Sequence, residues 1–520
     1  MKGTRGFFAS LAWTSRCGHA AGVRSCENLS TLAIAIAFSF AGMLLSGCAV
    51  GPNYLRPKID LPEGFMEDAH WRPAAYPHSE ETSVIDDSST VVQAVGPRDH
   101  HAQWWLLWND AALNELEQRA LLSNQSIVHA EASYRQARAL VSEARSSLFP
   151  SASFVFDPSR DRVADYESSR ARYTYYTVTD VHASVEARWE LDLWGKARRS
   201  LEAATDSGQA EAAIGDAVKL SVTAELAQAY LYLRQSDLDL HALRTERQAY
   251  LRIVNMTRLS HHQGLVTDDE VLQTENALSE VETQIDREES ARSREEHAIA
   301  ALVGVAPEKF SIASVPDYRF ACPDIAPILP SALLERRPDI VAAERRAAAA
   351  NAEIGVAQSA YFPDVLLGAG IGGEGATLLS ILSAPARVWS LGPSLAMSLF
   401  DAGRNRARVQ GAHADYDAAA ASYRATVINA LQEVEDGLAQ QREGDRVADS
   451  LRQVFQRSKQ LNLDQKAQRR VGIATDLSVV QSDIIVLNAQ RRWQAATASA
   501  ALYRVVLVRD IGGGWEGFER

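Results

Sequence analysis

His261 and His262 are the residues whose types most directly suggest metal chemistry. Adjacent residues of a helix point to different faces, so the two rings are poorly placed to share one ion. Glu433, Glu435 and Asp436 form an acidic cluster, for which a solvated helix face is the simpler interpretation. The chain contains no nucleophile-and-base pattern, phosphate-binding loop or metal-ligand spacing. The sequence therefore predicts no enzyme, no metal site and no cofactor.

Cys48 follows a segment typical of lipoprotein precursors. An apolar run over 32–45 is too short for a good transmembrane helix and is typical of a signal-peptide core. The run leads into Leu-Ser-Gly-Cys, which resembles the lipobox at which the cysteine is lipidated. A plain apolar patch with a chance cysteine is the alternative. We predict a signal peptide over 1–47, lipidation of Cys48 and a lipid-anchored extended segment over 48–100.

The other cysteines, Cys17, Cys26 and Cys322, fit neither a metal site nor a disulfide framework. Once the signal peptide is removed and Cys48 is acylated, Cys322 has no partner. We expect Cys322 to be a small buried apolar residue. The formal net charge of −13 argues against nucleic acid as a partner, because phosphate binding needs a basic face.

The chain contains two copies of one unit. The segment 264–268 (GLVTD) recurs at 472–476 (GIATD), an offset of 208 residues that also relates Gly195 to Gly403. Upstream, Phe149-Pro150 and Phe362-Pro363 differ by 213, so the first copy is five residues longer in between. We place the two repeats at 101–310 and 311–520.

Each repeat is predicted to contain two strands and a long helix. The sharpest alternation of apolar residues with polar ones is at Val181, Ala183, Val185, Ala187, Trp189 and Leu191. We expect strands at about 151–159, 173–192, 364–372 and 389–400, with loops over 158–172 and 373–388. No proline interrupts 195–262 or 403–470, so each range predicts a helix roughly 100 Å long. Such helices need partners along their length.

The predicted strands are too few to close a membrane barrel alone, since known barrels start at about eight strands. Three chains would supply twelve strands, and the repeat makes that ring nearly sixfold. The predicted fold is mainly α with membrane β: a trimeric twelve-stranded barrel continued by a long α-helical barrel. A dimer with eight strands is also arithmetically possible.

Several segments, in this order, resemble the TolC-like outer-membrane factors, and most closely their NodT-type lipoprotein branch. The resemblance runs from Cys48 to about Arg509 and is carried by 104–110 (WWLLWND), 189–196 (WELDLWGK), 334–340 (LERRPDI) and 401–404 (DAGR). It implies a homotrimer in the outer membrane, lipid-anchored and extending into the periplasm. It also implies a passive exit duct for drugs or other small toxic compounds, working with a periplasmic adaptor and an inner-membrane pump of the RND type. A type I protein-secretion duct and a structural lipoprotein without a pore are the alternatives.

The resemblance also assigns residues to the periplasmic end. Gly264, Leu265, Gly472 and Ile473 match tip residues that meet the adaptor, and Leu477, Ser478 and Gln481 match the residues that narrow the aperture. Some members carry acidic residues at the last two positions, and this chain does not. Arg469 matches a latch position beside Arg470, and we hypothesise an ion pair from either to Asp269 or Glu270. A solvated charged face is the alternative.

Overall fold

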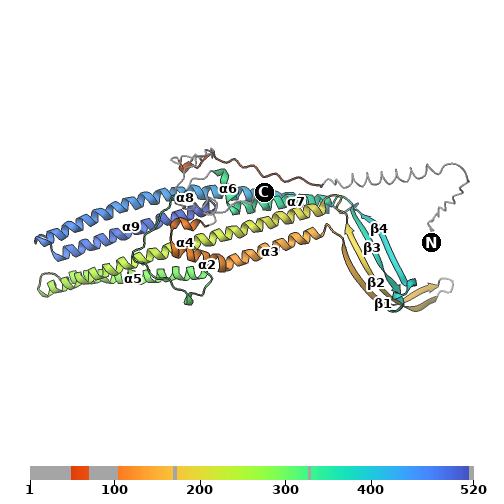
Figure 1. Cartoon of the computed structure of the whole chain (residues 1–520), viewed down its shortest axis with the longest axis horizontal. Coiled ribbons are helices and arrows are strands. Elements are labelled where there is room, and N and C mark those ends of the chain that lie inside the picture. Colours follow the sequence, from red (N-terminus) through yellow and green to blue (C-terminus); the bar gives the residue numbers. More distant parts are fainter. Residues whose placement is uncertain (1–48, 69–102, 168–171, 326–329, 514–520) are drawn as a thin grey trace, which may run out of the picture.

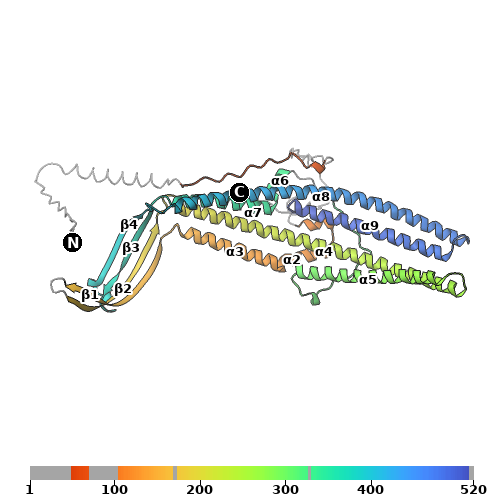
Figure 2. The same ribbon diagram turned by 180° about the vertical axis from the view of Figure 1, so that it is seen from behind.

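The computed structural model describes residues 49–68, 103–167, 172–325 and 330–513. The chain forms an elongated helical body with a four-stranded sheet at one end (Figure 1). Turned by half a circle, the molecule shows the same arrangement, with two helical tips at the end opposite the sheet (Figure 2). Among the described residues, no helix has the length and apolar character needed to cross a membrane.

The two predicted repeats are present in the order of the elements. The first contains α2 (Ala111–Ser123), α3 (Gln125–Ser146), β1 (Ser151–Glu167), β2 (Arg172–Glu190), α4 (Lys196–His262) and α5 (Asp268–Leu302). The second contains α6 (Pro330–Arg336), α7 (Pro338–Ser359), β3 (Asp364–Gly375), β4 (Arg387–Ala396), α8 (Arg404–Arg470) and α9 (Asp476–Asp510). Helices α4 and α8 both have 67 residues, and α5 and α9 both have 35.

Short 3-10 turns complete the described elements: η1 (Met66–Asp68), η2 (Trp104–Trp108), η3 (Pro307–Lys309), η4 (Ser380–Leu382) and η5 (Ala384–Ala386).

The long helices agree with the predicted ranges to within one residue at each end. Strand β1 is longer than predicted and takes in most of the expected 158–172 loop. Pro158 does not end it, because β1 is an edge strand, where a missing N–H is tolerated.

The sheet is antiparallel throughout, in the order β1-β2-β3-β4. Strands β1 and β4 have one neighbour each, so both edges of the sheet are unpaired among the described residues. Ser153, Glu186, Gly370 and Ser390 lie opposite one another in a single row across the sheet. This register fixes which side chains share a face.

The main core lies midway along the helical body, where η2 and α2 pack against the middle of α4 and the end of α9. Trp104, Trp105 and Trp108 are almost fully buried there. Asn109 turns the chain with a φ of 49°, and Asp110 caps α2 through Ala112 N and Leu113 N. The other oxygen of Asp110 accepts hydrogen bonds from two phenols, Tyr230 and Tyr318, at 2.8 and 2.9 Å.

Helix α4 is the central element of the body. It packs against α3, α7 and α2 on the side of the sheet and the core, and against α5 and α9 toward the tips. Helix α8 packs against α7 and α9. Both tips are therefore the far ends of helix pairs that are held together mainly along their length.

Candidate functional site

The two tips have the same backbone design. After α4, Gly264 adopts a φ of 76°, and Leu265 N returns a hydrogen bond to Ser260 O. After α8, Gly472 adopts a φ of 79°, and Ile473 N bonds Gln468 O. This is the glycine-ended helix cap, in which a left-handed residue satisfies the last carbonyls. An added Cβ would meet nothing within 4 Å at either glycine, so backbone conformation and not space favours glycine here.

The next helices begin alike. Thr267 accepts a hydrogen bond from Glu270 N at the start of α5, and Thr475 accepts one from Ser478 N at the start of α9. Each turn displays a large apolar side chain to the solvent just after its glycine. Leu265 is 71% exposed and Ile473 is 76% exposed. Apolar groups held out at the end of a rigid turn are suited to contact another protein.

A basic side chain contacts an acidic one across the turn of each tip. Arg469, in the last turn of α8, contacts both carboxylate oxygens of Asp476 at 2.7 Å. His261 Nε2 lies 3.0 Å from Asp268 Oδ1 in the first tip. The offset of 208 residues relates His261 to Arg469 and Asp268 to Asp476. The hydrogen bonds from Arg469 lower the pKa of Asp476.

The hypothesised latch pairs are not formed among the described residues of a single chain. Arg469 pairs with Asp476 across its own tip, because seven residues bring the last turn of α8 beside the first turn of α9. Arg470, Asp269 and Glu270 are exposed, and the two tips are separate in both views (Figures 1 and 2). A latch between neighbouring chains stays a prediction.

The three predicted aperture residues lie in the first two turns of α9. Leu477 and Gln481 are exposed and one turn apart, whereas the hydroxyl of Ser478 bonds Thr475 O within the cap. The adjoining face of α9 packs on α4, where Val480 and Ile484 contact Ala249 and Ile253. Leu477 and Gln481 therefore lie outside the face of α9 that packs on α4.

Polar contacts that were not predicted from the sequence hold α9 in place. Lys466 Nζ lies 2.7 Å from Asp483 Oδ1, which joins α8 to α9, and Asn462 bonds Asp483 and Ser482. Arg491 pairs with Asp239 and Glu246 of α4, where Glu246 also accepts from Asn488. Burial raises the pKa of Asp239 and Glu246. Charged residues on α9 were the available signal, but the partners of Arg491 and Asn488 lie on α4 in the first repeat.

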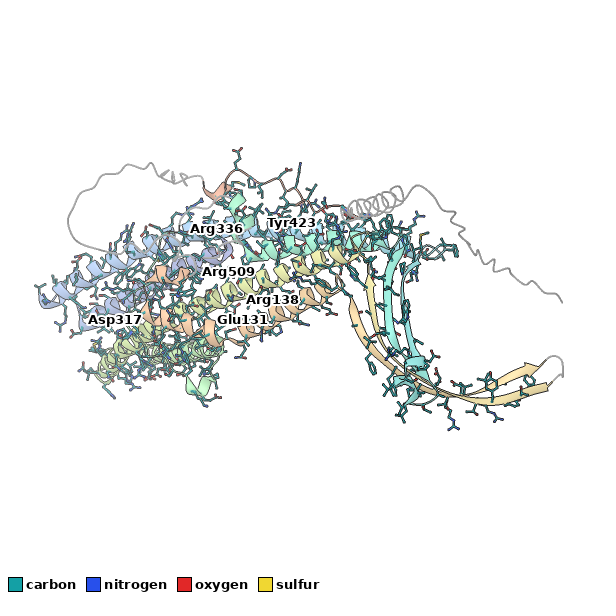
Figure 3. All side chains as sticks on the ribbon, turned by 45° about the vertical axis from the view of Figure 1, so that its right-hand side comes forward. Glu131, Arg138, Asp317, Arg336, Tyr423 and Arg509 are labelled. Atoms are coloured by element: carbon teal, nitrogen blue, oxygen red, sulfur yellow. The ribbon has the colours of Figure 1, made fainter. Side chains whose placement is uncertain are left out.

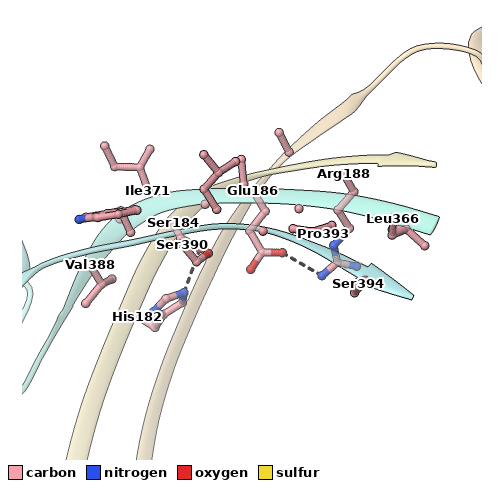
Figure 4. Close-up of a pocket in the computed structure, with 18 residues that line it drawn as sticks. His182, Ser184, Glu186, Arg188, Leu366, Ile371, Val388, Ser390, Pro393 and Ser394 are labelled. Carbon is pink, nitrogen blue, oxygen red and sulfur yellow. Dashed lines mark hydrogen bonds and ion pairs between the residues drawn. The ribbon is translucent and has the colours of Figure 1, made fainter. Parts of the chain in front are cut away.

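The sheet has two chemically distinct faces. One carries exposed apolar side chains from all four strands, namely Phe154, Phe156, Val185, Trp189, Ile371, Trp389, Leu391 and Leu395. The other carries His182, Ser184, Glu186 and Arg188 over the glycine-rich β3, where they line a hollow of about 590 Å³. Figure 4 shows Ile371 on the side opposite His182 and Glu186. Arg188 pairs with Glu186 at 2.9 Å, and His182 bonds Ser184.

The first described residues, from Ala49 on, dock where the sheet meets the helices. A Cβ on Gly195, which has a φ of 81°, would lie 2.8 Å from Ala49, and Val50 N bonds Trp194 O. The buried Arg199 donates to Val50 O, Gly51 O and Asn53 Oδ1. Gly355 makes room on the other side, since its Cβ would lie 2.8 Å from Val50 O. Cys48 itself lies outside the described residues.

Two other predictions concern single residues. Cys322 is exposed and not buried as expected, because it lies in a non-helical segment that covers the core only in part. His261 and His262 are both on the first tip, where His261 faces Asp268. Among the described residues, no group of three or more possible metal ligands gathers.

The family model for "Outer membrane efflux protein" matches residues 116–305 and 329–513, one match for each repeat. The chain belongs to this family. The outer membrane protein OprJ of Pseudomonas aeruginosa is 28% identical to this chain, over 91% of this chain's length and 94% of OprJ's length. Nodulation protein T of Rhizobium leguminosarum bv. viciae is 29% identical over 90% of this chain and 89% of its own.

Solved structures agree with this assignment. The outer-membrane channel OprN superimposes with a TM-score of 0.76 at 29% identity, covering 90% of this chain and all of the other. This efflux protein therefore shares both the sequence repeats and the fold of outer-membrane channels. Its function is that of an outer-membrane channel component of an efflux pump.

Proposed function

We propose that this efflux protein is the subunit of a homotrimeric, lipid-anchored exit duct with a gated periplasmic aperture. It would carry drugs or other small toxic compounds and act with a periplasmic adaptor and an inner-membrane pump of the RND type. It would perform no catalysis. The observation that carries the proposal is a four-stranded sheet with two free edges and one apolar face, continuous with long helices.

The free edges favour assembly with further copies. Unpaired strand edges pair with other strands unless they are covered, and closure in a ring removes them. Edge β4 of one copy would pair with edge β1 of the next, and three copies would make a twelve-stranded barrel. The apolar face would then meet lipid, and the face with Glu186 and Arg188 would line the lumen.

The docking of Ala49 supports a lipid anchor at Cys48. Ala49 is held against Gly195, at the end of β2 where the sheet gives way to the helices. This level is the expected inner surface of the membrane, which is where acyl chains on the preceding residue would insert. Gly195, Gly355 and Arg199 therefore serve to hold the chain at that height.

The opposite end would be the periplasmic aperture. Leu477 and Gln481 face away from the packed side of α9, as residues that narrow a channel should. Ser478 belongs to the cap of α9, where its backbone N–H donates a hydrogen bond to the hydroxyl oxygen of Thr475. Leu265 and Ile473, beside Gly264 and Gly472, would contact the adaptor. Arg469 and Arg470 would latch the neighbouring chain's Asp269 or Glu270 when Arg469 leaves Asp476.

Single-channel conductance of the purified, lipidated protein in a planar bilayer tests the proposal. Discrete steps are expected, and Arg469→Ala with Arg470→Ala should raise the open probability. Arg452→Ala with Arg457→Ala, on the exposed side of α8 away from the tip, is the matched control. If all three proteins remain silent while shown to be inserted, the pore is excluded and the structural lipoprotein is favoured. Steps whose open probability is unchanged in the tip variant would refute only the latch.

A further inference from the structure

The β1–β2 hairpin extends beyond the four-stranded sheet. Strand β2 pairs with β3 over only ten residues, Val181–Glu190. Its first part, 172–180, pairs with β1 alone, in an unbroken register from Ser159↔Asp180 to Glu167↔Arg172. Figure 3 shows this two-stranded ribbon running on past the ends of β3 and β4. Repeat two has no such ribbon among its described residues, since its strands are joined through η4 and η5.

The ribbon's two faces differ in charge. Alternation continues the apolar face of the sheet, with Phe154 and Phe156, into Arg160 and Arg162. On the same face, the Arg162 guanidinium lies 4.9 Å from the centre of the Tyr175 ring, which stacks with Tyr173. The opposite face carries Asp157, Asp161 and Asp180. Within 157–164 and 173–180, the cations therefore lie only on the side that continues the apolar face.

The height of the arginines follows from the register. Ten residues of tilted strand are what the hydrocarbon layer requires, so Val181 marks its outer boundary. Arg160 pairs with Thr179, and Arg162 pairs with Thr177. At about 3.3 Å per residue, the two pairs lie roughly 7 and 13 Å beyond Val181 along the strand. The polar head-group layer of a bilayer is of the order of 5–8 Å thick on each side, and tilt lowers both arginines toward it.

We propose that Arg160 and Arg162 bind the phosphate groups of phosphorylated glycolipid (lipid A) in the outer leaflet of the outer membrane. A guanidinium matches phosphate geometry, and stacking on Tyr175 holds Arg162 ready for it. Continuity with the apolar face identifies the occupant as a lipid, because the acyl chains would lie against Phe154 and Phe156. The acidic opposite face would repel the same phosphates, which confines binding to the outside.

This inference rests on the proposed orientation of the duct, with the sheet in the membrane and the tips in the periplasm. The test uses the full-length protein in detergent, titrated with bisphosphorylated lipid A and with lipid A lacking both phosphates, and read by native mass spectrometry. The wild type should bind the bisphosphorylated form roughly tenfold more tightly, and Arg160→Gln with Arg162→Gln should abolish that preference.

Arg404→Gln with Arg406→Gln is the matched control. It removes the same charge, at the same spacing, from exposed positions at the other end of the sheet, and it should keep the preference. An unchanged preference in the ribbon variant, or an equal loss in both variants, overturns the inference. Conductance measured on the same samples separates it from the proposed function: steps in wild type and ribbon variant alike sustain the duct whatever the lipid result.

Discussion

At the scale of single residues, Glu117 is out of place in an apolar core. It lies on α2 between Leu113 and Ala120 and is fully buried, and its carboxylate oxygens accept no hydrogen bond from the described residues. Burial raises the pKa of Glu117 well above its ordinary value. The folded state therefore favours the neutral acid. Its contribution to stability is complete below the ordinary pKa and is lost as pH rises toward the raised one.

We predict that Glu117→Gln flattens the dependence of folding stability on pH. Between the two pKa values, the wild type loses about 1.4 kcal/mol of stability per pH unit through this group, and the neutral amide does not. The variant should match the wild type near pH 4 and have the higher melting temperature at pH 8. Thermal unfolding from pH 4 to pH 9 measures this. Glu115→Gln, exposed on the same helix, should follow the wild type, and a Glu117→Gln curve parallel to both would contradict the assignment.

The paired tips give a second prediction at this scale. The first tip relies on His261, which pairs with Asp268 as an ion pair only when protonated, whereas the second relies on Arg469. Because its pKa is lowered, Asp476 is charged at neutral pH and pairs there with Arg469. Arg469→Ala should therefore lower the amide-exchange protection of the second tip about two- to fivefold at pH 7 and leave the first tip unchanged.

His261→Arg is the matching variant, since it gives the first tip the residue of the second. At pH 7 it should raise the amide-exchange protection of the first tip and leave that of the second tip unchanged. Unchanged protection of both tips in the two variants would show that these pairs do not close them.

At the scale of elements, the docking of the N-terminal segment depends on Arg199. Its side chain is only 6% exposed and holds three acceptors of the segment 50–53. Arg199→Ala should lower the free energy of unfolding by about 2 kcal/mol and make this segment accessible to protease. Arg244→Ala removes an exposed pair with Glu289 and should cost less than about 1 kcal/mol. An equal, small effect of both would mean that the segment is held by other contacts.

The elements were also the level at which the sequence was most informative. The long helices were predicted because neither contains a proline, and the strands because their alternation has a fixed period. The β1 part of the ribbon, 160–167, was predicted as a loop, since Pro158 and mixed polar residues hide a register that only pairing reveals. Arg469 was assigned a distant partner, because side-chain pairing across a turn depends on how the cap places the next helix. Glu117 could have been noticed in the sequence, because it lies four residues after Leu113, which is the spacing of residues on one helix face.

At the scale of the whole molecule, the free edges of the sheet predict covalent trapping of the ring. Ser153 on β1 and Ser390 on β4 lie in one row on the polar face, each on a strand with a free edge. In a Cys322→Ser background, Ser153→Cys combined in turn with Ser390→Cys, Gly392→Cys or Ser394→Cys covers the unknown register between chains. Oxidation of the membrane-embedded protein should give covalent dimers and trimers for at least one pair.

Glu186→Cys with Gly370→Cys provides the control, because these residues already face each other within one chain. This pair should cross-link without forming oligomers. If the covalent products stop at dimers, and their size is that of a closed eight-stranded ring, the dimeric ring is favoured over the trimer. If no edge pair yields covalent oligomers while the control pair cross-links efficiently, then β1 and β4 do not meet between chains. The helical ring would then have to assemble around sheets that stay separate.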